Sequence, residues 1–139
     1  MADYAGDITP QQAWEMVEDG AVLVDVRTAA EWQWVGVPET AAAGEAPVFV
    51  EWVTWPGGAQ NQSFLTQLAD AGLTADGDRP IVFLCRSGQR SIAAATVATA
   101  AGIGPSYNIV GGFEGGPDEA GHRGSTAGWK ASGLPWRQS

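Results

Sequence analysis

The residues with the clearest potential for chemistry lie around the single cysteine, in the segment Cys85-Arg86-Ser87-Gly88-Gln89-Arg90-Ser91. An apolar run precedes the cysteine, and an alanine-rich stretch follows the loop. A turn from a strand into a helix directs several backbone N–H groups toward one point, and the helix start adds its positive dipole end. Because these groups stabilise a thiolate, the pattern predicts a reactive nucleophile.

A lone cysteine can also be a buried, chemically inert residue, and three local facts argue against that interpretation. Cys85 ends a predicted strand, and open α/β sheets bind their ligands at the carboxyl ends of strands. Arg86 and Arg90, two of the seven lysines and arginines of the chain, lie within five positions of it. The residues between them are small and polar. We therefore expect Cys85 to be catalytic.

The elements that must position this loop are predicted from local patterns. Thr9 followed by Pro10 is typical of a helix start, and this helix should extend to about Gly20. Thr28 is expected to cap a short second helix that includes Ala29, Ala30, Glu31 and Trp32. Buried strands are predicted at four apolar runs, residues 21–26, 48–52, 81–84 and 107–110.

Two more helices are expected between these strands. One begins near Asn61, places Phe64, Leu65 and Leu68 on its inner face, and ends at Gly72. The other spans residues 91–101. Residues 36–47 are predicted to be a loop and 76–80 a turn, and the glycine-rich stretch 117–139 carries one short helix at 125–132. Strands that alternate with helices indicate an α/β fold, with a mostly parallel sheet covered on both faces, in one domain spanning residues 1–139.

Composition and charge narrow the classes of function. The 139 residues are 45% hydrophobic, which suits one globular core, and no stretch reaches the roughly 20 apolar residues of a membrane helix. A net charge of -9 argues against nucleic-acid and anionic-membrane partners, which need a basic surface. The first residues lack a secretory signal, and one cysteine allows no internal disulfide. We expect a cytoplasmic protein.

Three motifs in this order, Asp25-Val26-Arg27, the Cys85 to Ser91 loop and Gly111-Gly112-Phe113, closely resemble those of a single-domain rhodanese. The resemblance extends from Ile8 to about Pro135, and Gly128-Trp129-Lys130 also looks like the family's C-terminal part. It implies a three-layer fold with a central five-stranded parallel sheet. It also implies a sulfurtransferase that needs no cofactor.

The resemblance further implies a persulfide mechanism. The Cys85 thiolate takes a sulfane sulfur from a small anionic donor such as thiosulfate, or from a persulfide donor. It then passes the sulfur to a thiophilic acceptor such as cyanide or a thiol. A protein such as a cysteine desulfurase or a thioredoxin-type protein could serve as donor or acceptor.

The residues that follow Cys85 are expected to bind the anionic persulfide through convergent donors. Gly88 permits a tight turn, and Arg86 lines the entrance and attracts the donor. Arg90 orders the loop or contacts the substrate. The hydroxyls of Ser87 and Ser91 donate further hydrogen bonds, although Ser91 can equally cap the helix; Gln89 completes the loop.

Loop length separates this chain from proteins with a related thiolate loop. Four residues lie between Cys85 and Arg90, whereas phosphatases of this type place one more there and form a wider site. The shorter loop suits a single sulfur atom. A thiolate-based phosphatase or arsenate reductase is the second hypothesis. A non-catalytic rhodanese-like module, binding a partner through its tryptophan-rich insertion at 32–55, is the third.

Other polar and aromatic residues are given structural roles. We expect Asp25 and Arg27 to support the fold, with Arg27 and Glu31 placed to pair across a helix start. His122 is assigned to a surface loop, and one histidine with one cysteine argues against a zinc site.

Gly111 and Gly112 are expected to permit close backbone approach to the active-site loop. The tryptophans, which include Trp32, Trp34, Trp52 and Trp55, either wall an acceptor pocket or fill the core. Gly36-Val37-Pro38-Glu39 departs from the family's usual Gly-His-Ile-Pro pattern, which leaves acceptor identity open.

Overall fold

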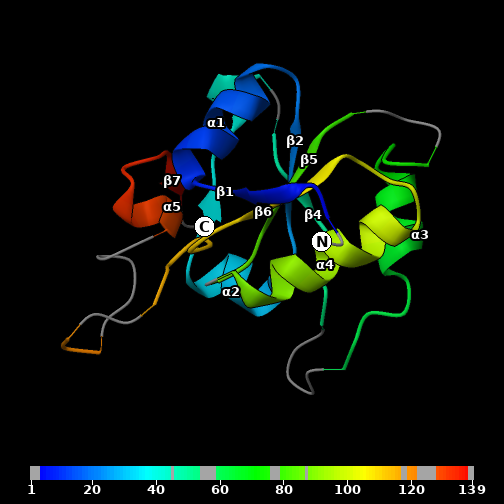
Figure 1. Cartoon of the computed structure of the whole chain (residues 1–139). Helices are drawn as coiled ribbons and strands as arrows, with labels where there is room; N and C mark the ends of the chain where they lie inside the picture. The colour runs from blue at the N-terminus through cyan, green and yellow to red at the C-terminus, as the bar shows by residue number, and fades with distance from the viewer. Residues whose placement is uncertain are drawn as a thin grey trace.

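A five-stranded parallel sheet forms the centre of the molecule (Figure 1). The computed structural model describes residues 4–44, 46–53, 59–75, 79–86, 88–116, 119–121 and 128–137. The strands are β1 (Gly6–Ile8), β2 (Val22–Asp25), β4 (Val48–Phe49), β5 (Ile81–Leu84) and β6 (Ser106–Ile109). They lie in the order β1-β6-β5-β2-β4, and every pairing is parallel. The predicted sheet is confirmed, and the strand that leads into Cys85 is its middle strand.

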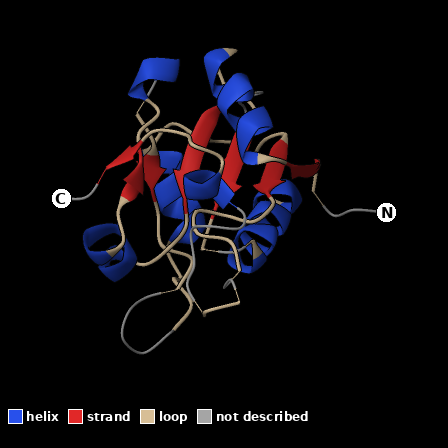
Figure 2. Ribbon diagram, turned by 90° about the vertical axis from the view of Figure 1, so that its left-hand side faces the viewer, coloured by secondary structure: helices blue, strands red, loops and turns tan. Residues whose placement is uncertain are grey.

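Helices cover both faces of the sheet (Figure 2). They are α1 (Pro10–Glu18), α2 (Ala29–Trp34), α3 (Phe64–Asp70), α4 (Gln89–Ala100) and α5 (Gly128–Ala131). Buried residues of α3 and α4 share one core cluster, and those of α1 and α5 share another. In Figure 1, α1 lies above the sheet and α4 below it. The α/β architecture inferred from the alternating pattern is therefore confirmed.

The position of β5 in the middle of the sheet explains why its sequence is apolar at every position. Side chains of a strand alternate between the two faces. Phe83 packs in the cluster with α3 and α4, whereas Val82 and Leu84 pack in the cluster with α1 and α5. All three side chains are fully buried. A strand covered on both faces, as β5 is, favours apolar residues at every position.

Two threonines start helices as predicted. The Thr9 side chain accepts from the Gln12 N–H, and the Gln12 side chain accepts from the Thr9 N–H. Thr28 and Glu31 form the same reciprocal arrangement at the start of α2. These capping boxes satisfy backbone donors that the first helical turn leaves free.

Other helix boundaries differ from the prediction. The helix after the cysteine begins at Gln89 rather than at residue 91. The N-cap position of α3 is Ser63, and Asn61 instead accepts from the Ser63 N–H two residues on. Leu65 is 38% exposed and does not lie on the inner face. A short helix leaves its periodicity ambiguous, so local pattern alone placed Leu65 incorrectly.

Short strands account for the remaining differences. Residues 36–47 are not only a loop, because β3 (Val37–Pro38) pairs antiparallel with β7 (Trp136–Arg137) and residues Ala41–Ala43 form a 3-10 turn. The predicted strand 48–52 is reduced to β4, and β1 was not predicted. The C-terminal helix is present as α5; residues 125–127 of that prediction and 76–78 of the predicted turn lie outside the described residues. Within the described part of the chain, each helix is too short or too polar to span a bilayer.

Candidate active site

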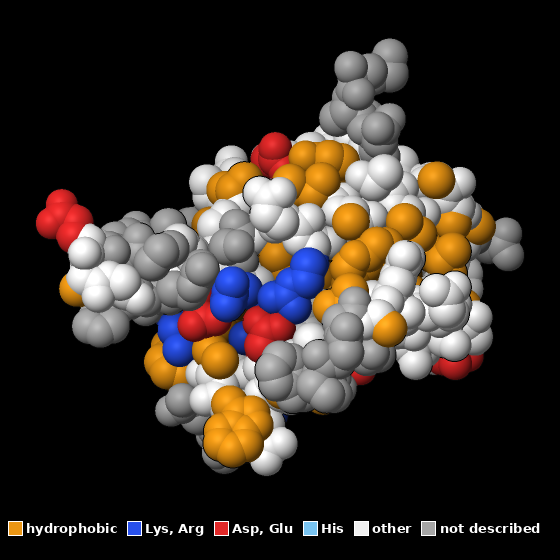
Figure 3. Space-filling model, turned by 90° about the horizontal axis from the view of Figure 1, so that it is seen from below, with side chains coloured by type: hydrophobic (Ala, Val, Ile, Leu, Met, Phe, Trp, Pro, Cys, Tyr) orange, Lys and Arg blue, Asp and Glu red, His pale blue; other side chains and the backbone are white. Residues whose placement is uncertain are grey.

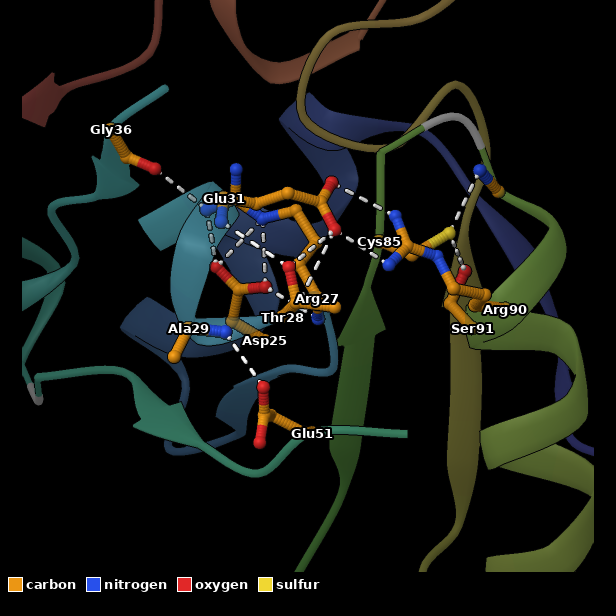
Figure 4. A network of polar contacts seen from close by, with 11 residues as sticks. Asp25, Arg27, Thr28, Ala29, Glu31, Gly36, Glu51, Cys85, Arg90 and Ser91 are labelled. Carbon is orange, nitrogen blue, oxygen red and sulfur yellow. Dashed lines mark hydrogen bonds and ion pairs between the residues drawn. The ribbon is translucent and has the colours of Figure 1, made fainter. Parts of the chain in front are cut away.

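Cys85 lies directly after β5, and its side chain is 1% exposed. The Gly88 N–H donates to the Cys85 sulfur with an N–Sγ distance of 3.0 Å. The Ser91 hydroxyl lies 3.2 Å from the same sulfur (Figure 4). Gly88 adopts a φ of 109°, which a residue with a side chain rarely adopts, and so turns the loop back over the sulfur. Ser87 lies outside the described residues.

A second segment holds the base of this loop. The Phe113 N–H donates to the Cys85 carbonyl at 2.7 Å, and the Glu114 and Gly115 N–H groups donate to the Arg86 carbonyl at 3.0 and 3.1 Å. Gly112 has a φ of 60°, and a Cβ atom there would come within 2.6 Å of the Arg86 carbonyl carbon. The close backbone approach expected at Gly112 is confirmed.

Arg90, the last residue of the six-residue segment that begins at Cys85, lies in the first turn of α4 and forms a bidentate ion pair with Glu31 of α2. Its Nη1 donates to Oε1 at 2.6 Å and its Nη2 to Oε2 at 2.9 Å. Burial acts to raise the pKa of Glu31, but hydrogen bonds from Arg90 and from the Thr28 backbone outweigh it and leave this pKa below its ordinary value. The Glu31 carboxylate in turn raises the pKa of Arg90.

The Arg27 guanidinium is directed toward Asp25 and the Gly36 carbonyl and not, as expected, toward Glu31. Its Nε and Nη2 donate to the Asp25 carboxylate at 2.9 and 2.6 Å, and Nη2 also donates to the Gly36 carbonyl at 2.7 Å. The guanidinium lies over the Phe113 ring, 4.2 Å from its centroid. No direct pair joins Arg27 to Glu31 among the described contacts, so that expectation is wrong. Arg27 and Asp25 are both fully buried, and their opposite charges compensate each other.

Charged side chains of both signs meet on the face seen in Figure 3, where Lys and Arg lie beside Asp and Glu. Figure 4 shows the ion pair of Arg90 with Glu31 next to that of Arg27 with Asp25. The positive charge near Cys85 is therefore held in fixed positions by carboxylates of β2 and α2.

Known proteins are similar to this chain in sequence and in fold. The sequence profile of the rhodanese-like domain matches residues 9–116. This chain belongs to the rhodanese-like family. It is 35% identical over 112 residues to the thiosulfate sulfurtransferase GlpE of Haemophilus influenzae, covering 78% of this chain and 85% of that one.

Two further relatives match nearly the whole rhodanese-like chain. An uncharacterized protein of Rickettsia conorii is 37% identical over 136 residues, covering 94% of this chain and 96% of that one. The crystal structure of Rv0390 from M. tuberculosis superposes with a TM-score of 0.88 at 57% identity, covering 98% and 99% of the two chains. The rhodanese-like fold predicted from the three motifs is therefore confirmed.

The remaining loop residues of this rhodanese-like domain differ in exposure. Arg86 and Gln89 are exposed, whereas Ser91 is fully buried in the first turn of α4. The Ser91 hydroxyl also contacts Asn108 Oδ1 at 2.5 Å, and Asn108 contacts Asp7. Sequence reasoning missed Asn108 and Asp7. The signal available was a polar residue inside the apolar strand 107–110.

Those tryptophans of the insertion that the structure describes do not form one wall. Trp32 is half-buried and packs edge-on against Phe49, with ring centroids 5.1 Å apart. Trp34 is 76% exposed, and Trp52 packs against Phe64 beside the core. Trp55 and His122 lie outside the described residues. Trp32 and Phe49 together line a surface hollow of about 490 Å³ whose lining does not include Cys85.

Proposed function

We propose that this rhodanese-like protein is a sulfurtransferase in which Cys85 carries a sulfane sulfur as a persulfide. The observation that supports it most is the environment of the Cys85 sulfur, which is buried at the end of the middle strand and accepts a hydrogen bond from the Gly88 N–H. Arg90, held by its ion pair with Glu31, follows at the end of the same loop. Positive charge and a backbone donor stabilise anionic sulfur there. The similarity to a thiosulfate sulfurtransferase adds support for this reaction.

The reaction proceeds in two displacements at sulfur. The Cys85 thiolate attacks the outer sulfur of thiosulfate, a new S–S bond forms, and sulfite leaves with the electron pair of the broken bond. An acceptor such as cyanide then attacks the outer sulfur of the persulfide. Thiocyanate forms and the Cys85 thiolate is regenerated, so neither step requires an oxidant or a reductant.

The two loop arginines have separate roles in this proposal. Arg86 is exposed and attracts the anionic donor to the site of a chain whose net charge is -9. Arg90 is held by Glu31 and orders the loop. Arg27 joins Asp25, at the end of β2, to the Gly36 carbonyl and so supports this part of the fold.

Intact-mass measurement tests the proposal directly. Incubation with thiosulfate should add one sulfur atom to the wild-type chain and none to Cys85→Ser, and cyanide should remove that atom as thiocyanate. Failure of thiosulfate and of an inorganic polysulfide to add sulfur to the wild-type chain would contradict the proposal.

A matched assay separates sulfur transfer from phosphate hydrolysis. We expect no Cys85-dependent hydrolysis of an aryl phosphate, because four residues between Cys85 and Arg90 leave a site narrower than that of a phosphatase. Hydrolysis that disappears in Cys85→Ser, together with no sulfur loading, would favour the phosphatase hypothesis. We further propose that the chain works in the cytoplasm, where a single reactive thiol stays reduced.

A further inference from the structure

We infer that Asn108, held in place by Asp7, is a positioning residue that draws the Ser91 hydroxyl hydrogen away from the Cys85 sulfur. As a result the Cys85 thiol donates to Ser91 instead of accepting from it. This inference rests on the proposed function of Cys85 as a nucleophile. It deepens that proposal by naming residues of β1 and β6 that act on the sulfur through Ser91.

The side of the sheet that α4 covers carries all four side chains of this network, namely Asp7, Asn108, Ser91 and Cys85. Asp7 of β1 stands opposite Asn108 of β6, and Asn108 stands opposite Phe83 of β5. Phe83 packs against α4, whose first turn carries Ser91. Asn108 is 2% exposed and Ser91 is fully buried. Polar groups buried to this degree require hydrogen-bond partners, so their contacts determine their orientation.

Asp7 determines which way the Asn108 amide faces. The Asn108 Nδ2 lies 2.9 Å from Asp7 Oδ1, and a carboxylate oxygen can only accept. The amide oxygen must therefore face Ser91. The Tyr4 hydroxyl donates to the same Asp7 oxygen at 2.8 Å and helps hold the carboxylate in place.

The orientation of Asn108 in turn determines what Ser91 can do. A hydroxyl has one hydrogen, and the Asn108 amide oxygen has none to offer. The 2.5 Å contact between Ser91 Oγ and Asn108 Oδ1 is thus a bond that Ser91 donates. The hydrogen in the 3.2 Å contact between Ser91 and Cys85 must then come from the thiol.

In this chain of bonds a Cys85 thiolate would have no hydrogen to donate to Ser91. If the thiol loses its proton to solvent, Ser91 either presents a lone pair to the thiolate or turns and leaves the buried Asn108 oxygen unpaired. Both outcomes are unfavourable. The Gly88 N–H, which donates to the same sulfur at 3.0 Å, acts in the opposite direction because it can stabilise a thiolate.

The persulfide avoids this conflict. Its negative charge lies on the outer sulfur, while the inner sulfur attached to Cys85 carries neither charge nor hydrogen. Ser91 can then keep its bond to Asn108. The Asp7, Asn108 and Ser91 chain therefore favours the loaded enzyme over the free thiolate.

The pH dependence of alkylation tests this orientation. The rate of modification of the full chain by iodoacetamide, followed by intact mass, should reach half its maximum at a lower pH in Asn108→Leu than in wild type. We expect a shift of about half to one pH unit, the effect of one hydrogen bond. Adding Ser91→Ala to Asn108→Leu should move the midpoint back up, because the freed hydroxyl is what stabilises the thiolate. An unchanged or higher midpoint in Asn108→Leu, or no effect of the added Ser91→Ala, would overturn the inference.

A second pair of variants changes only an exposed residue and so avoids disturbing the core. Asp7→Ala and Asp7→Asn remove the same charge, but only asparagine retains a side-chain oxygen to accept from Asn108 Nδ2. The midpoint should therefore lie at lower pH in Asp7→Ala than in Asp7→Asn, and equal midpoints would also overturn the inference. Alkylation needs no sulfur donor, so this result is independent of whether sulfur transfer is observed.

Discussion

Glu31 connects the active-site loop to α2 through two parallel hydrogen bonds from Arg90, at 2.6 and 2.9 Å. The same carboxylate accepts from the Thr28 N–H and forms the capping box of α2. The pair joins residues that are 59 positions apart in the chain. The Glu31 side chain therefore caps the start of α2 and also fixes the position of Arg90, at the end of the Cys85 loop.

Replacement of Glu31 should weaken the loop more than the rest of the fold. We expect Glu31→Gln to lower the free energy of unfolding by about 1–2 kcal/mol, because Arg90 loses a charged partner at a half-buried site. Sulfur loading should slow several-fold as Arg90 becomes mobile. Urea denaturation and timed intact-mass measurements check the two effects. Glu39→Gln, which breaks the exposed pair with Arg137, is the matched control and should change stability by less than about 1 kcal/mol.

The same pair predicts how stability depends on pH. The folded-state pKa of Glu31 lies below its ordinary value, so its contribution is present above about pH 4.3 and is lost as the pH falls through the folded-state pKa. The stability difference between wild type and Glu31→Gln should be largest at neutral pH and should shrink at about pH 3. A difference that grows on acidification would show that the ion pair is not its source.

Gly112 should not tolerate a side chain. Its φ of 60° disfavours any other residue, and a Cβ atom would lie 2.6 Å from the Arg86 carbonyl carbon. Gly112→Ala should therefore destabilise the protein by at least about 2 kcal/mol and displace the base of the Cys85 loop. Gly116→Ala meets nothing within 4 Å and is the control. Thermal unfolding together with the alkylation rate of Cys85 would compare the two, and equal behaviour would contradict the close approach.

Arg27 should be needed mainly because Asp25 is buried beside it. Arg27→Met leaves that carboxylate without a compensating charge and should cost about 3–5 kcal/mol of stability. The double variant with Asp25→Leu should be more stable than Arg27→Met alone. If the double variant is the less stable of the two in urea denaturation, the attraction itself, and not the unpaired charge, is what Arg27 provides.

The elements that could be predicted from the sequence are those whose signal is local. The middle strand β5 and the helix starts at Thr9 and Thr28 depend on neighbouring residues, and all three are confirmed. Strands of two or three residues such as β3 and β7 are defined by a distant partner rather than by their own side chains. Their sequences therefore carried no periodicity that local reasoning could detect.

The candidate site likewise combines residues that a local sequence signal predicts with residues that only distant contacts define. Cys85 and its loop were found because strand, loop and helix follow one another in the sequence. The pairing expected between Arg27 and Glu31 was wrong, because spacing along a helix says nothing of competing partners such as Asp25 and Arg90. Asn108 was missed because its contacts come from strand register and from α4, which only the folded chain brings together.

The middle position of β5 also determines how the base of the site fluctuates. Both edges of β5 are bonded, to β2 and to β6, whereas the two-residue strand β4 lies at a sheet edge. Amide hydrogens of β5 should therefore exchange with solvent only through global unfolding, and those of β4 through local opening. Cys85 directly follows the strand that we expect to open last. The geometry around its sulfur should therefore persist while the edges of the sheet open locally.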